Sequence, residues 1–374
     1  MRGLLCCIAL CPCALAGEGD AAKLAPAVRA LPPGWRFRDL AACPECKDRF
    51  PCAIAEDGGK VVVAFAEPSH GGLDLSTNLY SPPSFLREEP ENGEEYWDNE
   101  SLGKESLAQL DLAIGDDVVA IVWVPLGNVY DPRWTESVGG PGRWQAFFGD
   151  PNAPPMPSFP AFALARTKEK EIIAVHNDPE ARALEYLARP RGMSAVAIPV
   201  AAKEEVVSLA VQGNGTIHAL TFLDRKLSYL TNKGGAVKRE ILETGDLTEI
   251  RGAVAADEMG AAHVASRDSE TEGLLYRTNV SGKWISIVVE RGADAGVGCA
   301  IAVDAKGREH IAYTTPSGVR YATNTAGGWE VFAVAAGQPL PGCDVAIDAQ
   351  GYVHMCYAVG GKMVYATNRP QEKK

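Results

Sequence analysis

The sequence predicts an all-β fold, a seven-bladed β-propeller in which the N-terminal strand completes the last blade. Three observations predict it: a repeat of about 45 residues, four short alternating segments in each copy, and a final copy that lacks its fourth segment. The 374-residue chain is 46% apolar and 22% charged, which is enough apolar material for one large core.

The repeat is defined by a column of mostly aromatic residues that precede Thr-Asn or a looser version of it. The column contains Leu75, Trp134, Tyr186, Tyr229, Tyr276, Tyr321 and Tyr365. The spacings along it are 59, 52, 43, 47, 45 and 44 residues, so the first two copies carry insertions. Seven copies of one supersecondary unit predict seven blades.

Each copy contains four segments in which apolar and polar residues alternate, as in half-buried strands. In the sixth copy these segments are Cys299–Asp304, Glu309–Thr314, Val319–Asn324 and Trp329–Val334. Ala-Lys-Gly after Asp304 and Ala-Gln-Gly after Asp348 predict hairpins with glycine in the left-handed conformation.

The two ends of the chain predict how the ring closes. The seventh copy stops at Asn368, before its Trp-containing segment, while Gly34-Trp35 near the N-terminus resembles Gly328-Trp329. We therefore expect the N-terminal strand to supply the missing segment, which would leave no open sheet edge there. The propeller is assigned to residues 34–368, with a leader linker at 17–33 and a polar tail at 369–374.

Residues 1–16 have the pattern of a secretory signal peptide: a basic start, an apolar stretch and an Ala-Leu-Ala site ending at Ala16. This predicts a secreted or periplasmic protein. A lipid anchor on Cys11 or Cys13 is the competing interpretation. Leu10 and Pro12 disfavour it, because lipid attachment requires a small preceding residue.

Composition narrows the range of partners. The chain has 36 Lys and Arg against 48 Asp and Glu, a net charge of −12. An acidic surface excludes nucleic acid as the main partner and disfavours an anionic membrane. No apolar run is long enough for a transmembrane helix. We expect a monomer without a cofactor.

Three repeated patterns carry a resemblance: Asp-x-x-Gly-x-x-His, Tyr-Ala-Thr-Asn and Gly-Gly-Trp. They resemble the repeats of secreted bacterial seven-bladed propellers of the BNR or sialidase-like type, many of which have no assigned activity. The resemblance implies the fold. It does not imply sialidase chemistry, because the chain lacks that family's Arg-Ile-Pro motif and the Ser-x-Asp-x-Gly-x-x-Trp Asp-box. Propeller polysaccharide lyases resemble the chain at the level of fold.

Two polar columns follow the repeat. His218, His263, His310 and His354 begin the second segment of four copies, and Asp257, Asp304 and Asp348 precede the hairpin glycines. Histidines in different blades lie too far apart for one metal, so we expect structural hydrogen bonds. The aspartates suit either turn bracing or calcium binding. Turn bracing is favoured because no further carboxylates follow at calcium-loop spacing.

Cys43-Pro-Glu-Cys46, followed by Cys52, is an unusual local feature. A redox motif normally needs a helix N-terminus, and a zinc site needs a fourth ligand; neither is predicted here, so no metal site is assigned. We favour a disulfide that pins the closing strand, with the pairing open. Cys52, Cys299 and Cys343 occupy one repeat position, at the start of the innermost strand.

The loops of the first three copies are the predicted ligand-binding rim. Its candidate residues are His70, Tyr130, Asp131, His176 and Asp178. The segment Asp98–Glu105 is also predicted to be a loop of this face. Function concentrates in such loops, although a solvated, variable surface would look the same. We predict an exported, non-enzymatic propeller that presents a face to a glycan, a surface polymer or a protein. The alternative is a polysaccharide-acting enzyme, either a lyase or a glycoside hydrolase.

Overall fold

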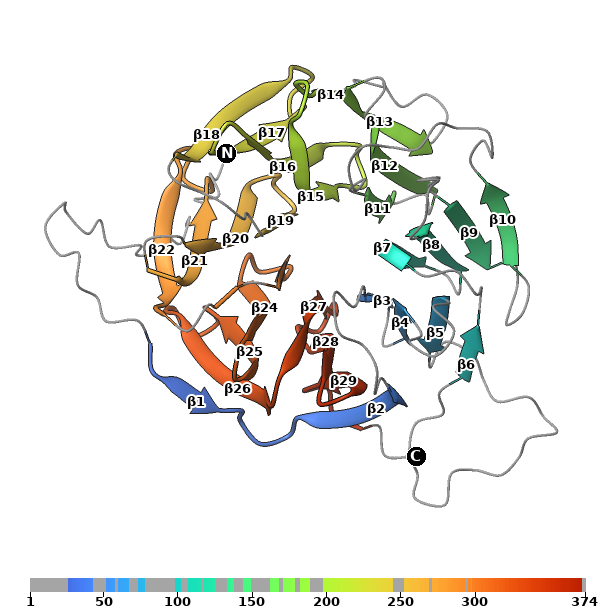
Figure 1. Ribbon diagram of the computed structural model, residues 1–374, viewed down its shortest axis with the longest axis vertical. Coiled ribbons are helices and arrows are strands. Elements are labelled where there is room, and N and C mark those ends of the chain that lie inside the picture. Colours follow the sequence, from blue (N-terminus) through green and yellow to red (C-terminus); the bar gives the residue numbers. More distant parts are fainter. Residues whose placement is uncertain are drawn as a thin grey trace, which may run out of the picture.

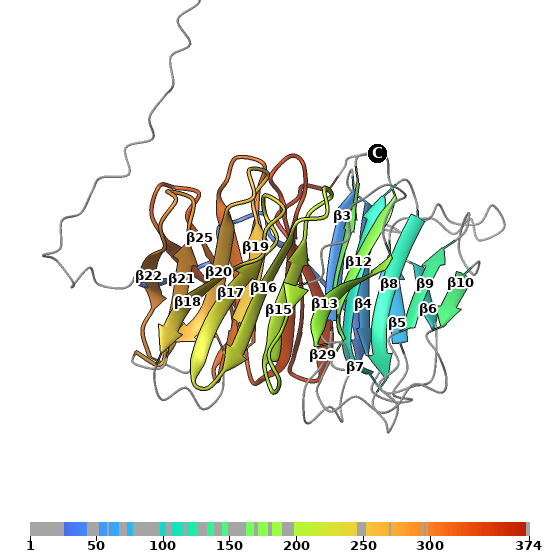
Figure 2. The ribbon, with the colours of Figure 1, turned by 90° about the horizontal axis from the view of Figure 1, so that it is seen from above.

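The computed structural model describes the following residues: 26–42, 52–57, 60–66, 73–77, 98–101, 107–115, 118–125, 133–137, 144–148, 162–167, 171–178, 182–188, 198–244, 252–268, 271–292, 295–296 and 298–371. Every regular element in these ranges is a strand, and no helix occurs among them. The strands form seven sheets arranged around a common centre (Figure 1). Together the sheets form a disc, and the strands of each sheet run from one face of this disc to the other (Figure 2). The all-β fold with repeated four-stranded antiparallel sheets is that of a β-propeller.

The first three sheets come from the N-terminal half. The first contains β3 (Cys52–Asp57), β4 (Lys60–Ala66), β5 (Leu73–Thr77) and β6 (Asp98–Ser101). The second contains β7 (Leu107–Gly115), β8 (Val118–Pro125), β9 (Arg133–Ser137) and β10 (Trp144–Phe148). The third contains β11 (Phe162–Arg166), β12 (Ile172–Asp178), β13 (Ala183–Ala188) and β14 (Ile198–Pro199).

The next two sheets are regular. The fourth contains β15 (Glu205–Val211), β16 (Ile217–Leu223), β17 (Lys226–Thr231) and β18 (Lys238–Thr244). The fifth contains β19 (Gly252–Ala256), β20 (Ala262–Asp268), β21 (Gly273–Thr278) and β22 (Ile285–Glu290).

The last two sheets each receive a strand from the N-terminus. The sixth contains β23 (Cys299–Val303), β24 (Glu309–Thr315), β25 (Gly318–Thr323), β26 (Glu330–Ala336) and β1 (Val28–Ala30). The seventh contains β27 (Pro339–Ile347), β28 (Val353–Val359), β29 (Lys362–Thr367) and β2 (Arg36–Ala42). In Figure 1 the blue N-terminal strands lie along the orange and red C-terminal ones.

The aromatic column of the sequence marks one position in all seven sheets. Its residues lie on the third strands, which are β5, β9, β13, β17, β21, β25 and β29. In the sixth copy the observed strands agree with the four predicted segments to within two residues at each end. The repeat was therefore aligned in the correct register.

Strand β2 pairs antiparallel with β29, from Arg36 opposite Thr367 to Ala42 opposite Lys362. Trp35, just before β2, packs on Tyr321 of the sixth sheet, with ring centroids 5.5 Å apart.

The tryptophans that precede the fourth strands of other sheets make the same contact. Trp329 packs on Tyr276 at 4.9 Å, and Trp284 packs on Tyr229 at 5.2 Å. Trp35 thus takes the repeat position that the last copy lacks.

Two local features differ from the expectations. Within the segment expected to be a linker, β1 pairs in parallel with β26, with Val28 opposite Val331. The prediction of a loop over Asp98–Glu105 is wrong at its start, because Asp98–Ser101 forms β6 and pairs with β5. The polar sequence Asp-Asn-Glu-Ser hides this strand, since β6 is the outermost strand of its sheet and has little apolar surface to bury.

The hairpins between first and second strands use glycine as predicted. Gly307 and Gly351 have φ values of 73° and 88°, in the left-handed region where a side chain is strained. Each donates its backbone N–H to the carbonyl of the aspartate three residues earlier, at 2.8 Å. These tight turns place the aspartate beside the histidine that begins the next strand.

Apolar clusters fill the spaces between neighbouring sheets. At the junction of the seventh and first sheets, Ile54 and Phe65 pack with Cys356, Met363 and Tyr365. In the described part of the chain, no helix is long and apolar enough to cross a membrane.

Candidate functional site

The predicted rim is only partly visible. His70, Tyr130 and Asp131 lie outside the described residues, so their convergence with His176 stays a prediction. His176 and Asp178 lie at the C-terminal end of β12, within the second strand of the third sheet and not in the loop that follows it. His176 is half-buried, opposite Phe162 on β11 and Glu185 on β13.

The column histidines have a clear structural role. In each of the four sheets that carry one, the imidazole Nδ1 lies within hydrogen-bond distance of the hydroxyl of the column tyrosine on the next strand. The pairs are His218–Tyr229 at 2.6 Å, His263–Tyr276 at 2.8 Å, His310–Tyr321 at 2.6 Å and His354–Tyr365 at 2.7 Å. The expectation of structural hydrogen bonds is confirmed, and the partner is the other conspicuous column of the repeat.

Burial sets the protonation state of these pairs. It lowers the pKa of His218, His310 and His354 to about 4, so these imidazoles are neutral at pH 7. Burial also raises the pKa of the Tyr229 hydroxyl to about 12 and that of Tyr321 still further. Efficient general acids and bases have pKa values near the working pH, whereas burial moves the pKa values of these His and Tyr side chains away from neutral pH.

The column aspartates brace the hairpins. Asp304 Oδ1 accepts hydrogen bonds from the backbone N–H groups of Lys306 and Arg308, both at 2.9 Å. Asp348 Oδ1 does the same for Gln350 and Tyr352, at 3.0 and 2.7 Å. The prediction of turn bracing is confirmed. The second oxygen of each aspartate faces the histidine Nε2, at 3.8 Å for Asp304 and 3.5 Å for Asp348.

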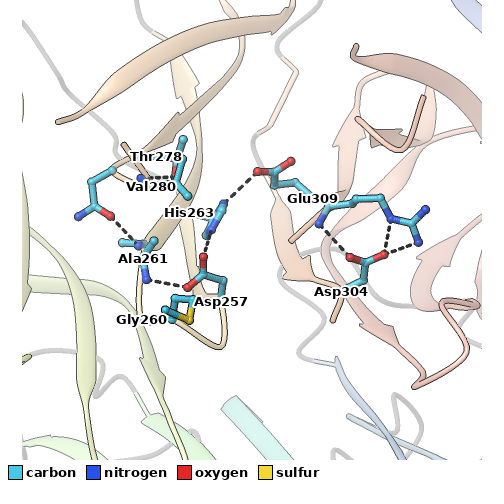
Figure 3. A network of polar contacts seen from close by, with 12 residues as sticks. Asp257, Gly260, Ala261, His263, Thr278, Val280, Asp304 and Glu309 are labelled. Atoms are coloured by element: carbon cyan, nitrogen blue, oxygen red, sulfur yellow. Dashed lines mark hydrogen bonds and ion pairs between the residues drawn. The ribbon is translucent and has the colours of Figure 1, made fainter. Parts of the chain in front are cut away.

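One such unit extends into the next sheet (Figure 3). Asp257 Oδ2 lies 3.6 Å from His263 Nε2, and Glu309 of the sixth sheet reaches the other nitrogen, Nδ1, at 3.1 Å. Tyr276 donates its hydroxyl hydrogen to the same Glu309 oxygen at 2.5 Å. The carboxylate therefore ties the fifth sheet to the sixth.

A related cluster lies where the seventh sheet meets the first. Ligand atoms of Glu56, Asp348 and His354 all lie within 4.8 Å of one another, and among the described residues this trio could hold a metal ion. Arg369 already supplies a cation there, with Nη1 3.2 Å from Asp348 and 3.6 Å from Glu56. The repeat gives no signal for this cluster, because Glu56 stands where the sixth and seventh copies have Val303 and Ile347.

Two carboxyl groups lie on innermost strands. Asp344 on β27 accepts hydrogen bonds from Ile54 N–H at 2.9 Å and from its neighbour Val345 N–H at 2.8 Å. Asp111 on β7 accepts from Leu164 N–H at 2.9 Å and Leu112 N–H at 2.8 Å. Each acid therefore links its own innermost strand to that of the next sheet.

Burial raises the pKa of Asp111 to about 6 and that of Asp344 to about 7, and repulsion from Asp111 adds to the second shift. Sequence reasoning missed both residues. The available signal was an acid inside an apolar strand, in Leu110-Asp111-Leu112 and Cys343-Asp344-Val345.

Of the cysteines predicted to form a disulfide, Cys43 and Cys46 lie outside the described residues, and a bridge that involves either of them stays a prediction, with the partner open. Cys52 begins β3 and has a free thiol, as do Cys299, Cys343 and Cys356.

Comparison with known proteins gives similarity of structure only. No family model matches the chain, and no curated protein matches it. AofleA from Arthrobotrys oligospora superposes with a TM-score of 0.51 at 12% identity, over 81% of this chain and 90% of that one.

Two further solved structures are similar at lower TM-scores. A protein of unknown function from Dyadobacter fermentans gives a TM-score of 0.44 at 14% identity, over 90% of this chain and 99% of that one. The Trypanosoma rangeli sialidase gives 0.45 at 9% identity, over 90% of this chain and 60% of that one. At these identities the comparisons bear on the fold, and the function has to be argued from the residues.

Proposed function

We propose that the protein is an exported seven-bladed propeller, closed by β2, that binds a glycan through the loops of its first three blades without turning it over. The observation that carries this proposal is the state of the column residues. The repeated His and Tyr side chains hydrogen-bond each other inside the sheets, and burial lowers the pKa of His310 and of His354 to about 4. The repeats therefore supply a rigid support and leave recognition to the loops between strands.

Two properties of the sequence favour the first three blades as the binding face. Their spacings along the column are longer than those of later blades, which gives longer loops and more shape. They also contain four of the seven tryptophans, Trp97, Trp123, Trp134 and Trp144. Trp134 and Trp144 fall in columns of the repeat, but exposed aromatic faces flanked by acids suit neutral sugars better than anionic polymers in a chain of net charge −12.

A glycan array tests the proposal. The intact protein is compared with a variant in which His70, Tyr130 and His176 are changed to alanine. A matched control changes Met259 and Val280, which are 83% and 60% exposed on short turns of the fifth sheet, to alanine. We expect the triple variant to lose glycan binding and the control to keep it. Equal loss in both variants, or binding that survives the triple change, would contradict the proposed face.

A specific observation supports the enzymatic alternative. Asp111 and Asp344 are carboxyl groups with pKa values near neutrality, as a general acid in glycoside hydrolysis requires. Both, however, accept two backbone hydrogen bonds and so already act as inter-strand links. Release of reducing sugar from a polysaccharide by the intact protein, lost in Asp344→Asn and in Asp111→Asn, would establish the enzyme in place of the binding protein.

A further inference from the structure

The three cysteines of the repeat column each contact the backbone of the neighbouring sheet, and Cys52 and Cys299 do so at the same repeat position. Cys299 Sγ donates to the carbonyl of Ala265 in the fifth sheet at 3.6 Å. Cys343 Sγ donates to Gly298 O, next to the sixth sheet, at 3.7 Å. Cys52 Sγ donates to Cys356 O in the seventh sheet at 3.9 Å. Each thiol thus lies against the backbone of the preceding sheet.

The residue facing the thiol differs at one junction. Two positions after the column histidine, the fifth and sixth sheets have Ala265 and Ala312, and the seventh sheet has Cys356. The repeat therefore places a cysteine beside an alanine elsewhere, and a second cysteine where the last sheet meets the first.

The two cysteines at this junction are neighbours, with Cys52 Sγ 3.9 Å from the carbonyl oxygen of Cys356. Cys52 and Cys356 belong to one apolar cluster between the seventh and first sheets. Burial, and then a hydrogen bond with the Cys52 thiol, raise the pKa of Cys356 well above its usual value. Cys356 is fully buried, and Cys52 is half-buried.

The sheet register excludes Cys343 as an equally placed partner of Cys356. Asp344 lies opposite Cys356, and Cys343 lies opposite Tyr357, so Cys343 and Cys356 are on opposite faces of the seventh sheet. Asp344 reaches Ile54 of the first sheet, whereas Cys343 contacts Gly298 on the other side. The face that carries Cys356 is the one turned toward Cys52.

We propose that Cys52 and Cys356 form a disulfide that closes the ring covalently between its first and last blades. The oxidant is a disulfide, either glutathione disulfide or that of a thiol oxidoreductase. Cys52, the more accessible thiol, attacks it and releases one thiol of the oxidant, and the Cys356 thiolate then displaces the other. The two cysteines lose two protons and two electrons, and the oxidant becomes two thiols.

The effect on stability follows from the length of chain enclosed. The two residues are 304 positions apart, so the bond would remove much of the freedom of the unfolded chain. It would also tie β28, which reaches the N-terminal strand β2 only through strand pairing with β29, covalently to the first sheet. We expect the oxidised protein to melt roughly 5 to 10 °C above the reduced protein.

Refolding of the reduced chain with glutathione disulfide tests the bond directly, independent of export or ligand. The product is alkylated after unfolding without reductant and is digested for peptide mapping. We expect the Cys52 and Cys356 peptides to be joined. Alkylation of both thiols, or Cys52 joined to any other cysteine, would overturn the proposal.

Melting with and without reductant supplies the second readout. In Cys356→Ala, which copies Ala265 and Ala312, we expect the effect of reductant on the melting temperature to lose most of its size, with any remainder coming from a bridge at Cys43 or Cys46. In the matched control Cys299→Ala, the shift of the parent should remain. A reductant-dependent shift of the parent's full size in Cys356→Ala would assign it to another disulfide and overturn the proposal.

Discussion

The last four sheets and the first sheet solve the same packing problem with different chemistry. In the seventh sheet His354 stands opposite Thr367, and its imidazole is paired with Tyr365. In the first sheet Val62 stands opposite Thr77 in the same position, fully buried, and Leu75 takes the place of the tyrosine. The same strand register therefore forms with a polar pair or with an apolar pair.

This difference teaches that the polar pair is one of two ways of filling the same position between neighbouring strands. Two buried polar groups are stable side by side only when they hydrogen-bond each other, whereas two apolar groups need no hydrogen-bond partner. The four sheets that carry a column histidine keep the pair as a unit. The first sheet replaces both members together, as this requirement predicts.

The largest expected effect comes from removing the N-terminal closure. Deletion of residues 17–40 removes β1, Trp35 and most of β2, and exposes the edge of β29 and the ring of Tyr321. We expect the melting temperature to fall by more than roughly 10 °C, because a whole strand and its packing are lost.

Deletion of residues 17–33 is the matched control for this closure. It removes β1 but keeps Trp35 and β2, and should lower the melting temperature much less. Equal melting of the 17–40 deletion and the parent would refute closure by β2.

The second effect sharpens the comparison of the two kinds of pair. His310→Val leaves the buried Tyr321 hydroxyl without its partner, and Tyr321→Phe leaves His310 Nδ1 without its own. Each change should cost about 2 kcal/mol in the free energy of unfolding. The double variant should cost less than the sum by about 1 kcal/mol, because it removes both partners. Urea unfolding measures all four proteins, and strictly additive costs would mean that the pair is not a unit.

The third effect is a dependence of stability on pH with opposite signs for the two groups of buried residues. The pKa of His310 is lowered to about 4, so its stabilising effect is complete above pH 6.5 and is lost as the pH falls toward 4. The pKa of Asp344 is raised to about 7, so its contribution is complete below pH 4 and is lost as the pH rises through 7.

Asp344→Asn isolates the second of these terms. Relative to the parent, the variant should gain about 2 kcal/mol in unfolding free energy between pH 5 and pH 8, because it no longer carries a buried ionisable group. Chemical denaturation at the two pH values measures the gain. An identical pH dependence in parent and variant would show that Asp344 does not titrate in this range.

The smallest effect is expected at the surface of the closing strand. Lys362 and Asp39 form an ion pair across β29 and β2, but both side chains are more than half exposed. Lys362→Ala should change the free energy of unfolding by less than about 0.5 kcal/mol. A loss comparable with that of His310→Val would mean that closure depends on charge more than on strand pairing.

Most of the fold could be predicted because alignment of the repeat copies shows which residues occupy equivalent positions on the strands. The strands over 299–334 and the role of Trp35 follow from aligning the copies. Strand β1 was not predictable, because three exposed residues, Val28–Ala30, have no pattern of their own and gain their partner from the position of β26. The strand Asp98–Ser101 escaped for a related reason, since its polar residues lack the alternation that marks a strand.

The site was less predictable. The sequence identified the histidine and tyrosine columns separately, but their pairing depends on a diagonal contact across two antiparallel strands, which becomes clear once the register is known. The role of Glu56 depends on contact with the seventh sheet, 290 residues or more away along the chain. The sequence of a single repeat copy does not indicate contacts of this kind with another sheet.

Histidine NMR tests the central claim most directly, because the six histidines divide into four column residues and the rim candidates His70 and His176. The claim is that the column is structural and that recognition belongs to the rim. We expect the resonances of His218, His310 and His354 to show no titration between pH 5.5 and 8 and no change with a bound glycan, since their pKa values lie near 4. The glycan should shift the His70 and His176 resonances. A column histidine that titrates near pH 6.5 and moves on ligand binding would contradict the account.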